Sequence, residues 1–112
     1  MIEINIENVA ASAASVVRLS GEIDATTAAV VQQNVLPLTT PGCRLVMDLT
    51  NVAYMSSAGL RMLLSLYRNA SSKQGKIVLV GLTEELRDTM SMTGFLGYFS
   101  LEDTVEAGLK SF

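Results

Sequence analysis

The stretch that decides the fold is Asp48-Leu49-Thr50-Asn51-Val52-Ala53-Tyr54-Met55-Ser56-Ser57-Ala58-Gly59-Leu60. An apolar run of strand length, residues 44–49, leads into it, and a segment with helical periodicity, residues 57–72, leads out of it. On that helix a core face is expected to hold Leu60, Leu63, Leu64 and Tyr67. A strand therefore gives way to a helix at Ser56 and Ser57.

Toward the N-terminus, the pattern predicts two strands and a helix. Residues 2–7 alternate apolar and polar side chains, which is typical of a half-buried strand, here at the edge of a sheet. Residues 15–23 predict a second strand, close enough to form a hairpin with the first. Asp24 is a candidate N-cap for a helix that runs to Leu36 and stops at Pro37.

Toward the C-terminus, the alternation continues. Residues 76–81 predict a buried strand, and a helix from Thr83 is expected to end before Gly94. A short strand near residues 98–100 and a last helix over residues 102–110 complete the chain. Because each helix supplies the crossover that parallel neighbours need, the pattern predicts an α/β fold with a mixed, mostly parallel sheet of four to five strands and about four helices.

Length and charge narrow the class of protein. A chain of 112 residues fits one domain, residues 1–112. The formal net charge of −3 argues against nucleic acid as a partner, because nucleic-acid-binding domains usually carry excess Lys and Arg. No apolar run is long enough to span a membrane and no signal peptide is recognisable, so a cytoplasmic protein is expected.

The absence of histidine excludes much catalytic chemistry. With no His and one cysteine, Cys43, the chain cannot build a Ser-His-Asp or Cys-His nucleophile, and a structural zinc site would lack its usual ligands. Cys43 is expected to be a buried structural thiol. Without a Gly-rich phosphate loop or a convergent carboxylate pair, we expect neither an enzyme nor a cofactor.

Ser56 and Ser57 lie where a functional site is expected in an α/β fold, at the end of a strand and the start of a helix. Serines at helix starts often act only as caps. A phosphate there would be favoured by the helix dipole, so the fold could tolerate phosphorylation. At an interface, the same phosphate would add about −1.5 to −2 charge and repel a partner.

Three groups of residues resemble the STAS domain family, in its anti-anti-sigma factor (anti-sigma factor antagonist) type. Residues 48–60 resemble the pattern Asp-Leu-Ser-x-Val-x-x-x-Asp-Ser-Ser/Ala-Gly-Leu, and residues 19–24 resemble Leu-x-Gly-Glu-Leu-Asp. Thr93-Gly94-Phe95 followed by Tyr98-Phe99 is similar to the family's closing motif. These matches occur in the family's order over nearly the whole chain.

The resemblance implies a phosphorylation site at Ser57. Where the family commonly has Asp before this serine, the chain has Ser56, which removes a charge and adds a second candidate hydroxyl. Ala58 is a variation that the family tolerates. The resemblance also implies a partner-binding surface around Ser57, for which the candidates are Met55, Ser56, Ala58, Gly59 and Arg61.

Three other residues have two interpretations each. Asp24 has a sufficient role as a cap, while the resemblance places it near the phosphorylation loop, where it could contact a kinase or a nucleotide. Met62 and Leu66 lie to one side of the expected core face, so they are either part of a wide buried stripe or a partly exposed partner-binding patch.

The resemblance implies a binding module that works by partner switching. Unphosphorylated, it would bind an anti-sigma factor that is also a serine kinase, and a Ser/Thr phosphatase would reset it. The alternative is an accessory subunit that docks on a transport ATPase or a signalling complex without phosphorylation. Whether the chain acts as a monomer or a homodimer is left open by the sequence.

Overall fold

The computed structural model describes residues 1–112. Its strands form one sheet in the order β1-β2-β3-β4-β5, with β1 and β2 antiparallel and the other neighbours parallel. The strands are β1 (Ile2–Val9), β2 (Ala14–Gly21), β3 (Arg44–Asn51), β4 (Lys76–Val80) and β5 (Ser100–Glu102). The predicted α/β class, the mixed sheet and the edge position of β1 are confirmed.

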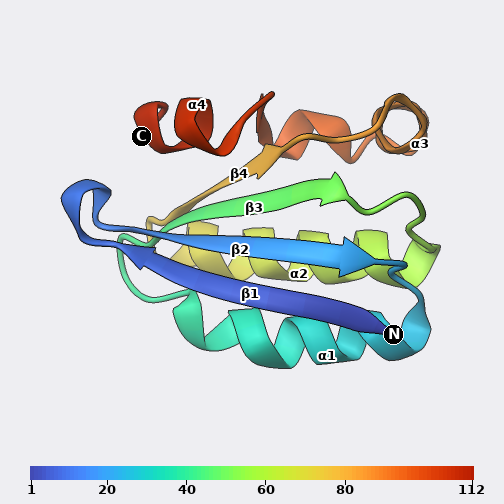
Figure 1. Ribbon diagram of the computed structural model, residues 1–112, viewed down its shortest axis with the longest axis horizontal. Coiled ribbons are helices and arrows are strands. Elements are labelled where there is room, and N and C mark those ends of the chain that lie inside the picture. Colours follow the sequence, from blue (N-terminus) through green and yellow to red (C-terminus); the bar gives the residue numbers. More distant parts are fainter.

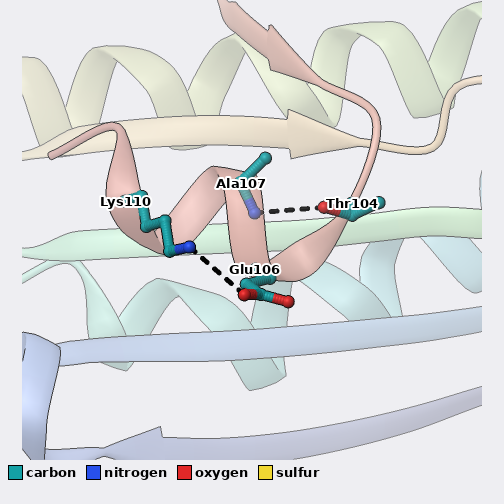
Figure 2. Close-up of polar contacts among 4 residues, drawn as sticks. All are labelled: Thr104, Glu106, Ala107 and Lys110. Atoms are coloured by element: carbon teal, nitrogen blue, oxygen red, sulfur yellow. Dashed lines mark hydrogen bonds and ion pairs between the residues drawn. The ribbon is translucent and has the colours of Figure 1, made fainter.

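The α-helices are α1 (Ala25–Val35), α2 (Ser57–Ser72), α3 (Glu84–Met92) and α4 (Val105–Lys110). Short 3-10 helices, η1 (Ala10–Ser12), η2 (Leu36–Leu38) and η3 (Leu96–Tyr98), lie in the connections. Three of the α-helices begin at a side chain that accepts backbone N–H groups, namely Asp24, Thr83 and Thr104. Figure 2 shows this cap at α4, where the Ala107 N–H donates to Thr104 Oγ1 at 3.1 Å and Lys110 pairs with Glu106 at 3.2 Å.

The sheet separates two cores of unequal size. The larger core lies between the sheet and helices α1 and α2, and Val17, Leu19, Leu45, Met47 and Leu79 project into it from the strands. The smaller core lies on the opposite face, where α4 covers Val16, Val46, Val78 and Val80 (Figure 1). Strands β3 and β4 are therefore buried on both faces, which explains why residues 44–49 and 76–81 are apolar almost throughout.

The C-terminal segment differs from its predicted boundaries. The last strand begins at Ser100, because Tyr98 closes the 3-10 helix η3 and packs against Tyr67 in a tilted arrangement, with ring centroids 5.4 Å apart. The last helix begins at Val105 because Thr104 provides the cap, so residues 102–104 do not belong to it. Glu102 instead closes β5, and Asp103 lies in the connection before the cap.

Of the two interpretations of Met62 and Leu66, the structure supports the buried stripe and not the exposed patch. Helix α2 packs against both α1 and β4, so its buried side is wider than a single stripe. Met62 and Leu66 are buried together with Leu60 and Leu63, whereas Leu64 and Tyr67, which were expected in the core, are half-buried. The wide buried stripe is therefore the correct interpretation of these residues.

Candidate functional site

The starts of α1 and α2 are joined by backbone hydrogen bonds. Ile23 and Met55 form an isolated parallel bridge, in which the Ile23 N–H donates to the Tyr54 carbonyl at 3.0 Å and the Ser56 N–H donates to the Ile23 carbonyl at 2.8 Å. Both segments follow the carboxyl ends of parallel strands, so the two helix N-termini lie at the same end of the sheet (Figure 1). The bridge brings Asp24 beside Ser56 and Ser57, although 32 residues separate Asp24 from Ser56 in the sequence.

Asp24 caps α1 in a reciprocal arrangement. Its carboxylate accepts the N–H groups of Thr26 at 2.9 Å and Thr27 at 3.0 Å, and the Thr27 hydroxyl accepts the Asp24 N–H at 2.8 Å. The bond from the Thr27 N–H contributes most to lowering the pKa of the Asp24 carboxyl, and the bond from Thr26 adds to it. Partial desolvation opposes the shift. Asp24 is therefore negatively charged at neutral pH.

The two serines of the site differ in exposure. Ser57 is the first residue of α2 and is exposed. Ser56 is the N-cap by position, yet its side chain makes no capping bond, and its Oγ is a buried side-chain oxygen without a hydrogen-bond partner. Ser57 is therefore the more accessible of the two residues.

Gly59 lets the first turn of α2 lie directly on the bridge. A Cβ at this position would collide with Met55 Cγ and would lie 2.8 Å from Ile23 Cγ2. No larger residue fits without displacing one of these buried side chains. The glycine of the Ser-Ala-Gly-Leu segment thus fixes the position of Ser57 relative to Asp24.

The residues selected from the sequence fall into three groups. Asp24, Ser57 and Arg61 are exposed around the helix starts, and Ser56 and Ala58 are half-buried. Met55, Gly59, Met62 and Leu66 are buried, so in this conformation they support the site from beneath. Tyr54 was not selected, although its side chain is 52% exposed directly before this segment. An aromatic residue in a loop between a strand and a helix was the signal that could have identified it.

Other features of the chain lie apart from this segment. Cys43 is buried as predicted, and desolvation raises the pKa of its thiol. No cluster of His, Cys, Asp and Glu is arranged to bind a metal, and no helix has the length and apolar character of a membrane span. A hollow of about 450 Å³ lies on the open face of β1, β2 and β3, and none of the residues predicted to bind a partner or to be phosphorylated lines it. Its lining residues are Glu3, Ile4, Asn5, Arg18, Leu19, Ser20, Asp48 and Asn51.

Comparisons with known proteins agree on one family. The model of the STAS domain matches residues 5–108. The anti-sigma factor antagonist BtrV of Bordetella bronchiseptica is 36% identical over 69 residues, a match that spans 62% of this chain and 60% of that protein. The anti-sigma-B factor antagonist of Bacillus subtilis is 29% identical over 94 residues, 84% of this chain and 86% of the relative. A crystal structure of an anti-sigma factor antagonist from Mycobacterium paratuberculosis superimposes with a TM-score of 0.85 at 28% identity, covering 99% of this chain and 93% of the other.

Proposed function

The chain belongs to the STAS domain family, and we propose that it is an anti-sigma factor antagonist whose partner binding is controlled by phosphorylation of Ser57. Unphosphorylated, it binds an anti-sigma factor, which then releases its sigma factor for transcription. The anti-sigma factor is also an ATP-dependent serine kinase that modifies Ser57, and a Ser/Thr phosphatase restores the binding form. The names of the relatives support the regulatory role.

The observation that carries the proposal is the contrast between the two serines. Ser57 presents an exposed hydroxyl at the first residue of α2, whereas the neighbouring Ser56 hydroxyl is buried. Ser57 also matches the phosphoacceptor position of the family motif. Exposure and motif thus support the same residue from independent directions.

The position of Ser57 allows phosphorylation without unfolding. The first-turn N–H groups of a helix lack intrahelical acceptors, and no side chain caps those of α2. A phosphate at Ser57 would lie at the positive end of the helix dipole, an interaction usually worth about 0.3 to 1 kcal/mol. The helix therefore tolerates the modified serine.

The same phosphate would weaken binding to a partner. It adds about −1.5 to −2 charge beside Asp24, which is already ionised at neutral pH. A partner surface that covers Asp24, Tyr54, Ser57 and Arg61 would have to desolvate both anions. A loss of about 3 to 4 kcal/mol lowers affinity several-hundred-fold, which is sufficient for a switch.

Kinase assays test the acceptor residue. The chain is incubated with ATP and an anti-sigma factor serine kinase from the same organism, and its intact mass is measured. We expect one phosphate on the wild type and on Ser56→Ala, and none on Ser57→Ala. Equal phosphorylation of Ser57→Ala would refute the assignment.

Binding measurements test the switch itself. The affinity for the anti-sigma factor kinase is measured by calorimetry. Ser57→Asp is expected to bind this kinase several-hundred-fold more weakly than the unphosphorylated wild type does. Ser71→Asp is the matched control, because it places the same charge on an exposed residue at the other end of α2. Equal affinities of the two variants would show that charge at Ser57 does not control binding.

The proposal assigns the chain to the cytoplasm, where transcription takes place, and gives it no catalytic step of its own. Docking on a transport ATPase or a signalling complex is the competing role. Affinity capture from native cells distinguishes the two, because recovery of membrane ATPase subunits without a kinase would contradict the regulatory role.

A further inference from the structure

The two edges of the sheet are protected very differently. At one edge, β5 is three residues long, and short edge strands offer little to an incoming strand. At the other edge, β1 is eight residues long and pairs with β2 in continuous register, from Ile2 opposite Gly21 to Val9 opposite Ala14. Strand β1 contains no Lys, no Pro and no bulge, three of the devices that prevent edge pairing, and its charged residues, Glu3 and Glu7, lie on the face away from α1 and α2.

Next to this edge, apolar side chains are exposed both on β1 and on α1, and together these side chains form the flank of the molecule at β1. Ile2, Ile4 and Ile6 share the face of β1 that points toward the helices, but Ile6 is 40% exposed while Ile2 and Ile4 are half-buried. In α1, Val30 is also 40% exposed. Gln32 marks the side of α1 nearest α2, because its Nε2 donates to Ser65 Oγ at 3.3 Å, and Val30 lies about 200° around the helix from it. Val30 therefore points away from α2, and α1 itself lies on the β1 side of α2 (Figure 1).

We propose that a second copy of this chain occupies this flank, with the two β1 strands paired antiparallel about a two-fold axis through Ile4. Only residues on the same face can lie opposite each other in an antiparallel pair, so the axis must pass through a residue. With the axis at Ile4, Ile2 lies opposite the partner's Ile6 and Ile4 lies opposite its own copy. On the other face, Glu3 lies opposite the partner's Asn5, whose amide can donate to the carboxylate.

The neighbouring registers are less favourable. An axis at Asn5 places Glu3 opposite the partner's Glu7, and an axis at Glu3 places two copies of this carboxylate opposite each other, so both arrangements are destabilised by like charges. An axis at Ile6 places Ile4 opposite the partner's Asn8. In the proposed register, isoleucine faces isoleucine throughout, and Glu7 keeps its own ion pair with Arg18 at 2.8 Å.

The paired form would leave Ser57 accessible. Strand β2 separates β1 from β3, and Ser57 follows β3. The dimer would therefore present two phosphorylation segments away from the shared edge. This inference does not depend on the proposed switch, since it concerns another surface.

Solution mass tests the interface. Sedimentation of the wild type over rising concentration is expected to show the mass increasing from 12.0 kDa to twice that value. Ile6→Lys should remain a monomer at the same concentrations, because the charge would lie in the apolar half of the paired edge. Met92→Lys, at a residue that is 87% exposed on α3, is the matched control and should dimerise like the wild type. A monomeric wild type up to about 1 mM, or a dimer unaffected by Ile6→Lys, would refute the proposal.

Disulfide trapping tests the register in a Cys43→Ala background. Ile4→Cys is expected to form a disulfide with its own copy, since the two residues lie opposite each other. Ile6→Cys alone should not, because its copies would be offset by four residues, about 13 Å along the strands, which is too far for a disulfide. Mixing Ile2→Cys with Ile6→Cys should give the mixed disulfide and covers the case in which Ile4→Cys folds poorly. Self-linking of Ile6→Cys, or no disulfide from any variant, would overturn the register.

Discussion

The N-termini of α1 and α2 lie side by side and are built in opposite ways. At α1, Asp24 and Thr27 satisfy each other's backbone N–H groups in a capping box. At α2, the residue in the equivalent position, Ser56, makes no capping bond and its hydroxyl has no partner. One helix start is closed by its own side chains, and the other leaves its first-turn N–H groups without a side-chain acceptor.

The difference shows that capping and packing can replace each other. Helix α2 is held by its wide buried side and by the Ser56 N–H bond to Ile23, so tertiary contacts stabilise it without a cap. The uncapped end is also the one that carries Ser57, where the proposed phosphate would find free donors. The helix start that carries Ser57 is thus held by buried contacts, while its first-turn N–H groups have no side-chain acceptor.

The largest effect is expected from Gly59→Ala, which attacks the packing that holds the open helix start. The added methyl would collide with Met55 and Ile23, and overpacking of this kind typically costs about 1 to 3 kcal/mol. Urea denaturation measures the loss. Gly97→Ala is the control, since no atom lies within 4 Å of its Cβ position, and it should change stability much less. Equal stability of Gly59→Ala and the wild type would contradict the tight contact.

A smaller loss is expected from Thr27→Val, which opens the closed helix start. The substitution keeps the shape but removes the hydroxyl that accepts the Asp24 N–H and donates to the Glu22 carbonyl at 2.8 Å. Loss of such bonds usually costs about 1 kcal/mol. Thermal unfolding measures the cost. Thr27→Ser is the converse control, because it lacks the methyl group but retains the hydroxyl and should keep both bonds. If Thr27→Val were as stable as the wild type, the capping box would contribute nothing.

A third, weaker effect is the pH dependence that Asp24 gives to α1. Because its pKa is lower in the folded chain than in the unfolded chain, its contribution is fully present above the unfolded value of about 3.9 and is lost as the pH falls through the folded value. Asp24→Asn can still cap but does not titrate. In chemical denaturation series at stepped pH, the stability difference between wild type and Asp24→Asn should therefore shrink as the pH falls below the unfolded value of about 3.9 toward the lower folded value. A constant difference over this range would argue against the shift.

The smallest effect is expected from Ser56→Ala. Since the Ser56 hydroxyl has no partner, its removal should change the free energy of unfolding by no more than about 0.5 kcal/mol, whereas loss of a working cap typically costs about 1 kcal/mol. Thermal unfolding of this variant beside Thr83→Ala, which removes a formed cap at α3, gives the direct comparison. A loss as large as that of Thr83→Ala would show that Ser56 does cap α2 in solution.

Much of the molecule could be predicted from local sequence. The N-cap at Asp24 and the start of α2 at Ser57 follow from residue type and periodicity, which act over a few neighbouring residues. The short C-terminal elements were less predictable, because the packing of Tyr98 against Tyr67 is a contact between distant segments.

The sequence by itself determined the α/β alternation, the edge position of β1 and the resemblance that directs attention to Ser57. Each of these depends on hydrophobic periodicity or on a motif of a few neighbouring residues. Only the tertiary structure decided that Met62 and Leu66 are buried, that the Ser56 hydroxyl is enclosed, and that Asp24 lies beside the serines. The physical reason is that burial and proximity depend on which elements pack together. The bridge between Ile23 and Met55 joins segments that no local pattern relates.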